Sequence, residues 1–125
     1  MDEDALFRIL SETIRQIASE ENCLFVGRCA EYILRERQDR LLSVFICADA
    51  EDRVARLCEL RGIKPDAARK LIQTNDKRRA AFHDFYSNHQ WGRAATYDLC
   101  INQSRLGMEG TKRFLLEYVK RRFNL

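Results

Sequence analysis

Hydrophobic positions in the first third of the chain follow two different periodicities. Between residues 4 and 20 the apolar side chains recur at three- and four-residue steps, which predicts an amphipathic helix. Two short, continuous apolar runs follow at residues 23–26 and 41–48. Runs of this kind are typical of strands that are covered on both faces of a parallel sheet. Residues 28–37 lie between the two runs and are expected to form a second helix.

The rest of the chain continues the alternation of helix and strand. Asp49 is expected to cap a helix that extends to about residue 60, where Gly62 ends it. Pro65 then begins a long helix. Residues 97–102 predict a last strand, and residues 109–123 a closing helix. Because strands alternate with helices throughout, the pattern predicts the α/β class with a parallel sheet.

Composition excludes several classes of protein without identifying a function. A chain of 125 residues is expected to form one domain over residues 1–125, and no stretch is apolar enough to cross a membrane. The acidic start lacks an export signal, and the five cysteines are scattered, so we expect a cytoplasmic protein without disulfides or a bound metal. A net charge of +3 is too small to indicate a nucleic-acid partner.

A phosphate-binding loop of the form Gly-x-x-x-x-Gly-Lys-Ser/Thr is absent from the sequence. The nearest segment, residues 107–112 (Gly-Met-Glu-Gly-Thr-Lys), has a shorter spacing between its glycines and places Thr before Lys. Such a loop must close several backbone N–H groups around one anion at the start of a helix. The segment is too short to do so.

Candidate ligand-binding residues lie at the carboxyl ends of the predicted strands, where open parallel sheets bind their ligands. These positions are Gly27-Arg28, Asp49 and residues 102–104. Arg28 follows a glycine and offers a planar fork of donors that suits a phosphate or a pyrimidine edge. A helix-starting arginine paired with a nearby carboxylate is an equally good interpretation.

A second group of basic residues lies on the two predicted helices that follow. Arg53 and Arg56 share one helical face, and Lys77, Arg78 and Arg79 follow on the next helix. Two such helices can close over a polyphosphate as a lid, although charge runs are more often solvated surfaces. Asp76 is a candidate to orient these arginines or to contact a ribose, and a surface ion pair is the alternative. His83 and His89 are expected to have no catalytic role.

The order of these segments resembles the cytidylate-kinase-like family of P-loop nucleoside monophosphate kinases. The resemblance rests on residues 26–34, residues 44–49 with Arg53 and Arg56, residues 76–79, Trp91-Gly92 and residues 97–102. It implies a three-layer α/β/α fold with a lid at about residues 50–95, and transfer of the γ-phosphoryl group of ATP, with Mg²⁺, to a nucleotide such as CMP. By the same resemblance, Arg28 contacts the acceptor, and the catalytic lid arginines are Arg53, Arg56, Arg78 and Arg79. Asp76, from its place among these arginines, is predicted as a second substrate-binding residue.

The sequence departs from the family pattern in two ways that affect the expected activity. The family's first strand, its P-loop and its acceptor-binding helices are expected to precede Met1, so we expect this chain alone to be inactive. Cys29 and residues 80–82 stand where cytidylate kinases carry charged side chains. The alternative is a non-catalytic, kinase-derived module that binds a nucleotide or a protein. Because the missing strand would leave edges and helix positions such as Leu6, Ile9 and Ile14 bare, we expect a homodimer or a partner that supplies the N-terminal part.

Overall fold

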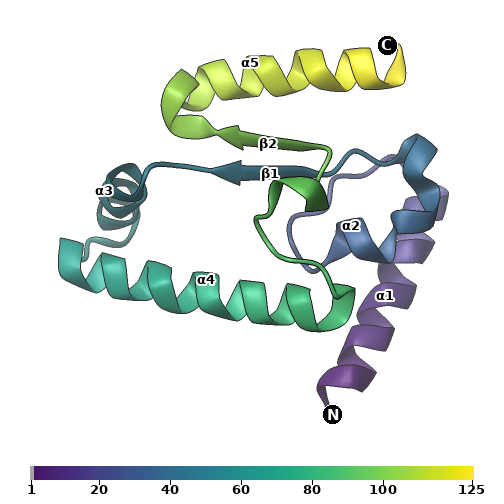
Figure 1. Ribbon diagram of the computed structural model, residues 1–125, viewed down its shortest axis with the longest axis horizontal. Helices are drawn as coiled ribbons and strands as arrows, with labels where there is room; N and C mark the ends of the chain where they lie inside the picture. Colours follow the sequence, from purple (N-terminus) through teal and green to yellow (C-terminus); the bar gives the residue numbers. More distant parts are fainter. Residues whose placement is uncertain (1) are drawn as a thin grey trace. The chain divides into compact units, whose positions relative to one another are not determined.

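The computed structural model describes residues 2–125, which divide into two compact units. The first unit comprises residues 2–41, and the second is Leu42–Leu125. The helices and strands of both units are labelled in Figure 1. The prediction of one domain over residues 1–125 stays a prediction.

The first unit is built on α1 (Glu3–Glu20), which confirms the predicted helix at residues 4–20. The carboxylate of Asp2 accepts a hydrogen bond of 2.7 Å from the Ala5 N–H and thereby caps the helix. Ile14 packs against Ile33 and Leu34 in a small hydrophobic core. Ile14 is therefore buried, contrary to the expectation, because its own unit covers it, whereas Leu6 and Ile9 are exposed as expected. The expected dimer stays a prediction.

The predicted strand at residues 23–26 is wrong. The segment is extended coil, with 90% of Leu24 and 86% of Val26 exposed. An apolar run becomes a strand only when a neighbouring strand satisfies its backbone, and both strands among residues 2–125 pair with each other in the second unit. The helix expected at residues 28–37 is also different, because Arg28 and Cys29 have positive φ and delay its start. The segment forms α2 (Ala30–Ile33) and the 3₁₀-helix η1 (Arg35–Arg40).

The sheet of the second unit consists of β1 (Val44–Cys47) and β2 (Leu99–Asn102), which pair in parallel with Phe45 opposite Cys100. Both strands lie within the predicted segments and are shorter than predicted. At the start of the sheet, the carbonyl of Ser43, which precedes β1, accepts hydrogen bonds from the N–H groups of Asp98 and Leu99. A small parallel sheet in a mostly helical chain agrees with the α/β class. The complete three-layer kinase fold stays a prediction.

Three α-helices belong to the second unit with this sheet. The helix α3 (Ala50–Arg61) ends at Gly62 with φ of +64°, and α4 (Pro65–Ser87) starts at a proline, as predicted. After the 3₁₀-helix η2 (Ala94–Thr96) and β2, α5 (Gln103–Phe123) begins earlier than the sequence pattern predicted and is interrupted at Gly107. In Figure 1, α3 follows directly from the end of β1, and α5 runs alongside the sheet. No helix within residues 2–125 combines the length and apolar character needed to cross a bilayer.

Candidate phosphate-binding site

Polar side chains connect the carboxyl ends of β1 and β2. The Asp49 carboxylate accepts a hydrogen bond of 3.0 Å from the Asn102 side-chain amide and also pairs with Arg105. The Asp49 N–H donates to the Ser104 hydroxyl over 2.8 Å. The sequence predicted that Asp49 caps α3, but its side chain makes no capping hydrogen bond to the helix. The carboxylate instead binds Asn102 and Arg105 at the neighbouring strand end. The two strand ends are joined at the edge where parallel sheets bind ligands.

Arg53 lies on the first turn of α3, immediately beyond this edge, and pairs with Asp76 of α4. Its guanidinium donates two hydrogen bonds to the two carboxylate oxygens, at 2.7 and 2.9 Å. This bidentate geometry is the strongest form of an arginine–carboxylate pair. The side chains are 33% and 25% exposed, so water screens the pair only in part. The pair joins the two helices of the predicted lid.

Arg79 lies one turn after Asp76 on α4 and donates to the same carboxylate. Its guanidinium carbon also lies 4.9 Å from the centre of the Trp91 ring. Two guanidinium groups thus share one carboxylate, and the cluster keeps one net positive charge. The hydrogen bonds from Arg53 are the main cause that lowers the pKa of Asp76, although partial burial opposes them. Asp76 consequently stays ionised at neutral pH and orients both arginines.

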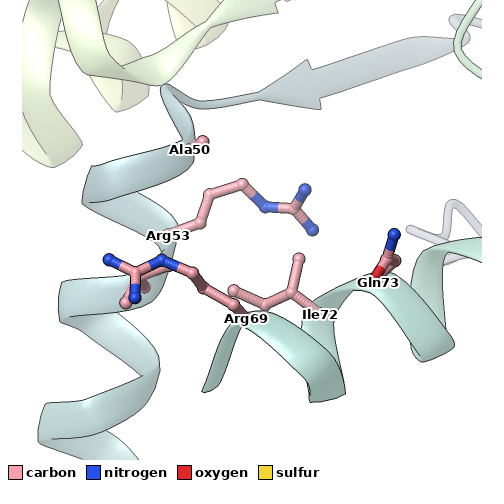
Figure 2. A pocket seen from close by; sticks show the side chains of 6 residues that line it. Ala50, Arg53, Arg69, Ile72 and Gln73 are labelled. Atoms are coloured by element: carbon pink, nitrogen blue, oxygen red, sulfur yellow. The ribbon is translucent and has the colours of Figure 1, made fainter. Parts of the chain in front are cut away.

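A cleft of about 250 Å³ lies between α3 and α4 beside this cluster. Its apolar lining comes from Ala50, Val54 and Ile72. Figure 2 shows the Arg53 side chain extending from α3 over Ile72, with Arg69 reaching back from α4. Arg69 pairs with Glu51 at 3.3 Å and with Asp66 at 3.0 Å. The cleft is smaller than most ligand pockets and fits part of a ligand, not a whole nucleotide.

The loop after α4 is held against the sheet by aromatic contacts. The Trp91 ring meets Phe45 of β1 edge to face, with ring centres 5.0 Å apart. Gly92 has φ of +79°, and a Cβ atom there would lie 3.3 Å from the Phe45 ring. The Gly92 N–H donates to the Tyr97 hydroxyl at 3.2 Å. These contacts explain the Trp-Gly pair, since only glycine allows both the turn and the close approach. Trp91 therefore packs against β1.

The structure brings together three of the six site residues predicted from the sequence. Arg53, Asp76 and Arg79 form one cluster, whereas the exposed side chains of Arg56 and Arg78 have no ion-pair or hydrogen-bond partner within residues 2–125. The sixth residue, Arg28, belongs to the first unit. It is exposed and has φ of +59° between Gly27 and Cys29, which are also left-handed. Two consecutive non-glycine residues in this conformation are unusual and are often found at functional sites.

His83 lies close to a serine and an aspartate without forming a catalytic relay. The Ser87 hydroxyl lies 3.3 Å and the Asp84 carboxylate 3.2 Å from the same ring nitrogen, Nδ1. A relay requires the two partners on opposite nitrogens, and Ser87 is buried at 2% exposure. The expectation that His83 has no catalytic role stays a prediction.

The residues of the chain fit a phosphate group better than they fit a magnesium ion. Mg²⁺ prefers carboxylate oxygens. Asp49 at the end of β1 and Asp76 in the arginine cluster are both already engaged by arginines. At the segment that resembled a P-loop, Gly107 breaks α5, and only two residues separate it from the next glycine. ATP and Mg²⁺ are therefore implied by resemblance alone, whereas Arg53 and Arg79 provide donors suited to phosphate oxygens.

Residues 1–105 match a family model described as the cytidylate kinase-like family. The chain belongs to this family. A crystal structure of an uncharacterized protein from Eubacterium ventriosum is similar to the chain, with a TM-score of 0.82 and 28% identity. The similarity covers 92% of this chain and 63% of the bacterial one, so the chain spans less than two thirds of that relative's length. No curated protein matches the sequence.

Sequence reasoning missed several residues that lie at this candidate site. Arg105 pairs with Asp49, and its place three residues beyond the end of the last strand was the available signal. Arg69 and Gln73 line the cleft, but their spacing in the sequence does not distinguish them from a solvated helix face. The stacking of Arg79 on Trp91 joins residues from different segments, and no local pattern predicts it.

Proposed function

We propose that this cytidylate kinase-like chain binds the phosphate groups of a nucleotide between α3 and α4, and that its lid arginines serve phosphoryl transfer. The observation that carries the proposal is the cluster of Arg53, Asp76 and Arg79 beyond the carboxyl end of β1. In phosphoryl transfer, the main task of the protein is to position the reactants and to neutralise negative charge. A cluster that holds two guanidinium groups in place and keeps a positive charge suits this task.

The proposed acceptor is a nucleoside monophosphate, with CMP as the first candidate because of the family. Arg28 is proposed to contact it, and its strained backbone supports this role. Cys29 and the uncharged residues 80–82 depart from typical cytidylate kinases, so the base is best identified by comparing CMP, UMP and AMP. Asp76 is proposed to orient the arginines, because the bonds to Arg53 and Arg79 already occupy both of its oxygens.

Isothermal titration calorimetry with CMP and with inorganic pyrophosphate tests this proposal. We expect Arg53→Gln or Arg79→Gln to weaken pyrophosphate binding roughly tenfold, because each removes a charge-assisted contact of about 1.5 kcal/mol. Binding should also weaken as salt rises from 50 to 200 mM. Arg121→Gln is the matched control, since Arg121 is an exposed arginine that pairs within α5. If the three variants bind pyrophosphate equally well, the proposed site is wrong.

A non-catalytic nucleotide-binding module is the second candidate, and the absence of a phosphate loop from the sequence favours it. Both candidates predict phosphate binding, so a binding experiment does not distinguish them. An ADP-release assay with ATP and each acceptor distinguishes them once the chain is combined with a P-loop-bearing polypeptide. We expect the chain alone to show no transfer, because it has no loop to hold the ATP phosphates. Turnover on the order of 1–100 per second by the chain alone would contradict this expectation. Turnover that appears only with a P-loop-bearing polypeptide would favour the kinase over the module.

A further inference from the structure

We propose that Trp91 is a positioning residue for Arg79 in the phosphate site. Its indole ring and the Asp76 carboxylate hold the Arg79 guanidinium from two sides, and this fixes the orientation of the remaining N–H donors before a phosphate binds. This inference rests on the proposed function and deepens it. It adds to the site an aromatic residue that makes no contact with phosphate itself.

The restraint on Arg79 matters because the side chain is otherwise free to move. Arg79 is 58% exposed, and an exposed arginine loses rotamer entropy when a ligand fixes its side chain. The aspartate uses part of the donor fork, and the centre of the indole ring lies 4.9 Å from the guanidinium carbon. A guanidinium that is already oriented loses less entropy on binding, and this raises affinity without a new contact.

Trp91 can hold another side chain because its own position is fixed. Its backbone N–H donates to the Asp84 carboxylate over 2.7 Å, which ties it to α4. Its ring lies edge to face on Phe45 of β1, at an angle of 84°. The following glycine allows this approach, as described above. The sheet, the indole, Arg79 and Asp76 therefore form one continuous support for the lid arginines.

Neighbouring arginines show what the tryptophan adds. Arg53 is fixed by two hydrogen bonds to Asp76, whereas the exposed Arg78 has no ion-pair or hydrogen-bond partner in the described part of the chain. Arg79 donates one hydrogen bond to Asp76 and depends on the ring for its second restraint. If position 91 served packing alone, other apolar side chains would fill it as well as tryptophan does. Of the three aromatic residues, however, tryptophan attracts a guanidinium most strongly.

A double-mutant cycle on pyrophosphate binding tests the inference. We expect Trp91→Leu to raise the dissociation constant by roughly three- to fivefold, and Trp91→Phe by about twofold, in proportion to the cation–π attraction lost. In an Arg79→Gln background the same changes should have no further effect. Phe85→Leu, at an aromatic residue of α4 that is 74% exposed, is the control and should leave pyrophosphate affinity unchanged.

The possible outcomes separate this inference from the proposed function. If the wild-type chain does not bind pyrophosphate, or if Arg79→Gln binds it as well as wild type does, both are overturned. If Arg79→Gln weakens binding and the Trp91 variants do not, only the role of Trp91 is overturned. If the Trp91 variants weaken binding equally with and without Arg79, the tryptophan acts through the fold and the inference is wrong. Trp91→Phe keeps a ring against Phe45, so the cycle does not depend on a variant with disturbed packing.

Discussion

Asp76→Asn removes the charge at the centre of the lid cluster and leaves its shape almost unchanged. The carboxylate receives two hydrogen bonds from Arg53 and one from Arg79, and its side chain is 25% exposed. A fully exposed ion pair contributes at most about 1 kcal/mol, whereas hydrogen bonds to charged groups contribute about 1.5–3 kcal/mol. Because the pair is bidentate and largely covered, we expect the free energy of unfolding to fall by about 2 kcal/mol.

Urea unfolding followed by circular dichroism measures this loss, and thermal unfolding gives a second reading. A loss of about 2 kcal/mol lowers the melting temperature of a chain of this size by about 8 °C. Combining Asp76→Asn with Arg53→Gln should give a coupling energy above about 1 kcal/mol, because the two side chains act as one unit. The matched control is Asp66→Asn, since Asp66 pairs with Arg69 at the surface with 95% of its side chain exposed.

The control variant should change stability by no more than about 0.5 kcal/mol. If Asp76→Asn costs no more than Asp66→Asn, Asp76 does not hold the two lid helices together. A coupling energy with Arg53 below about 0.3 kcal/mol would refute the reasoning in the same way, because it would mean that the bidentate pair adds no stability.

Three further predictions concern pH, the Trp-Gly turn and Arg28. The pKa of Asp76 is lowered below 3.8 in the folded chain, so its contribution is present above about pH 4; the stability gap between wild type and Asp76→Asn should persist from pH 7 to about pH 5 and close as the pH falls further. Gly92→Ala should lower stability by about 2 kcal/mol in urea unfolding, and by more than Gly62→Ala does, because both glycines have positive φ but only Gly92 faces a ring at 3.3 Å. Arg28→Gly should keep or raise the melting temperature because it relieves a left-handed backbone, while it weakens CMP binding; a lower melting temperature with unchanged CMP binding would make Arg28 structural.

The sequence predicted best those elements that depend on local signals. Gly62 and Pro65 mark the end of α3 and the start of α4, because backbone conformation at these residues is decided locally. The segment at residues 23–26 was predicted wrongly, since an apolar run does not reveal whether a neighbouring strand is present. The side chain of Asp49 was assigned to a helix cap, but it binds partners more than fifty positions away.

The candidate site was predictable only in part, because its residues come from segments that meet only in the folded chain. Arg53 and Asp76 were singled out by resemblance to a family, and the structure shows that they pair with each other. Helical spacing placed Arg56 and Arg78 beside them equally well, and only the three-dimensional packing shows which arginines have partners. The contact between Arg79 and Trp91 depends on the path of the loop after α4, which no periodicity specifies.

Side-chain nuclear magnetic resonance of the arginines during a pyrophosphate titration tests the central claim most directly. The claim is that the cluster of Arg53, Asp76 and Arg79 is a phosphate-binding site. We predict that the guanidinium resonances of Arg53 and Arg79 shift together and saturate with one dissociation constant, while those of Arg121 on α5 stay unchanged. Shifts confined to arginines outside the cluster, or none at saturating pyrophosphate, would contradict the account.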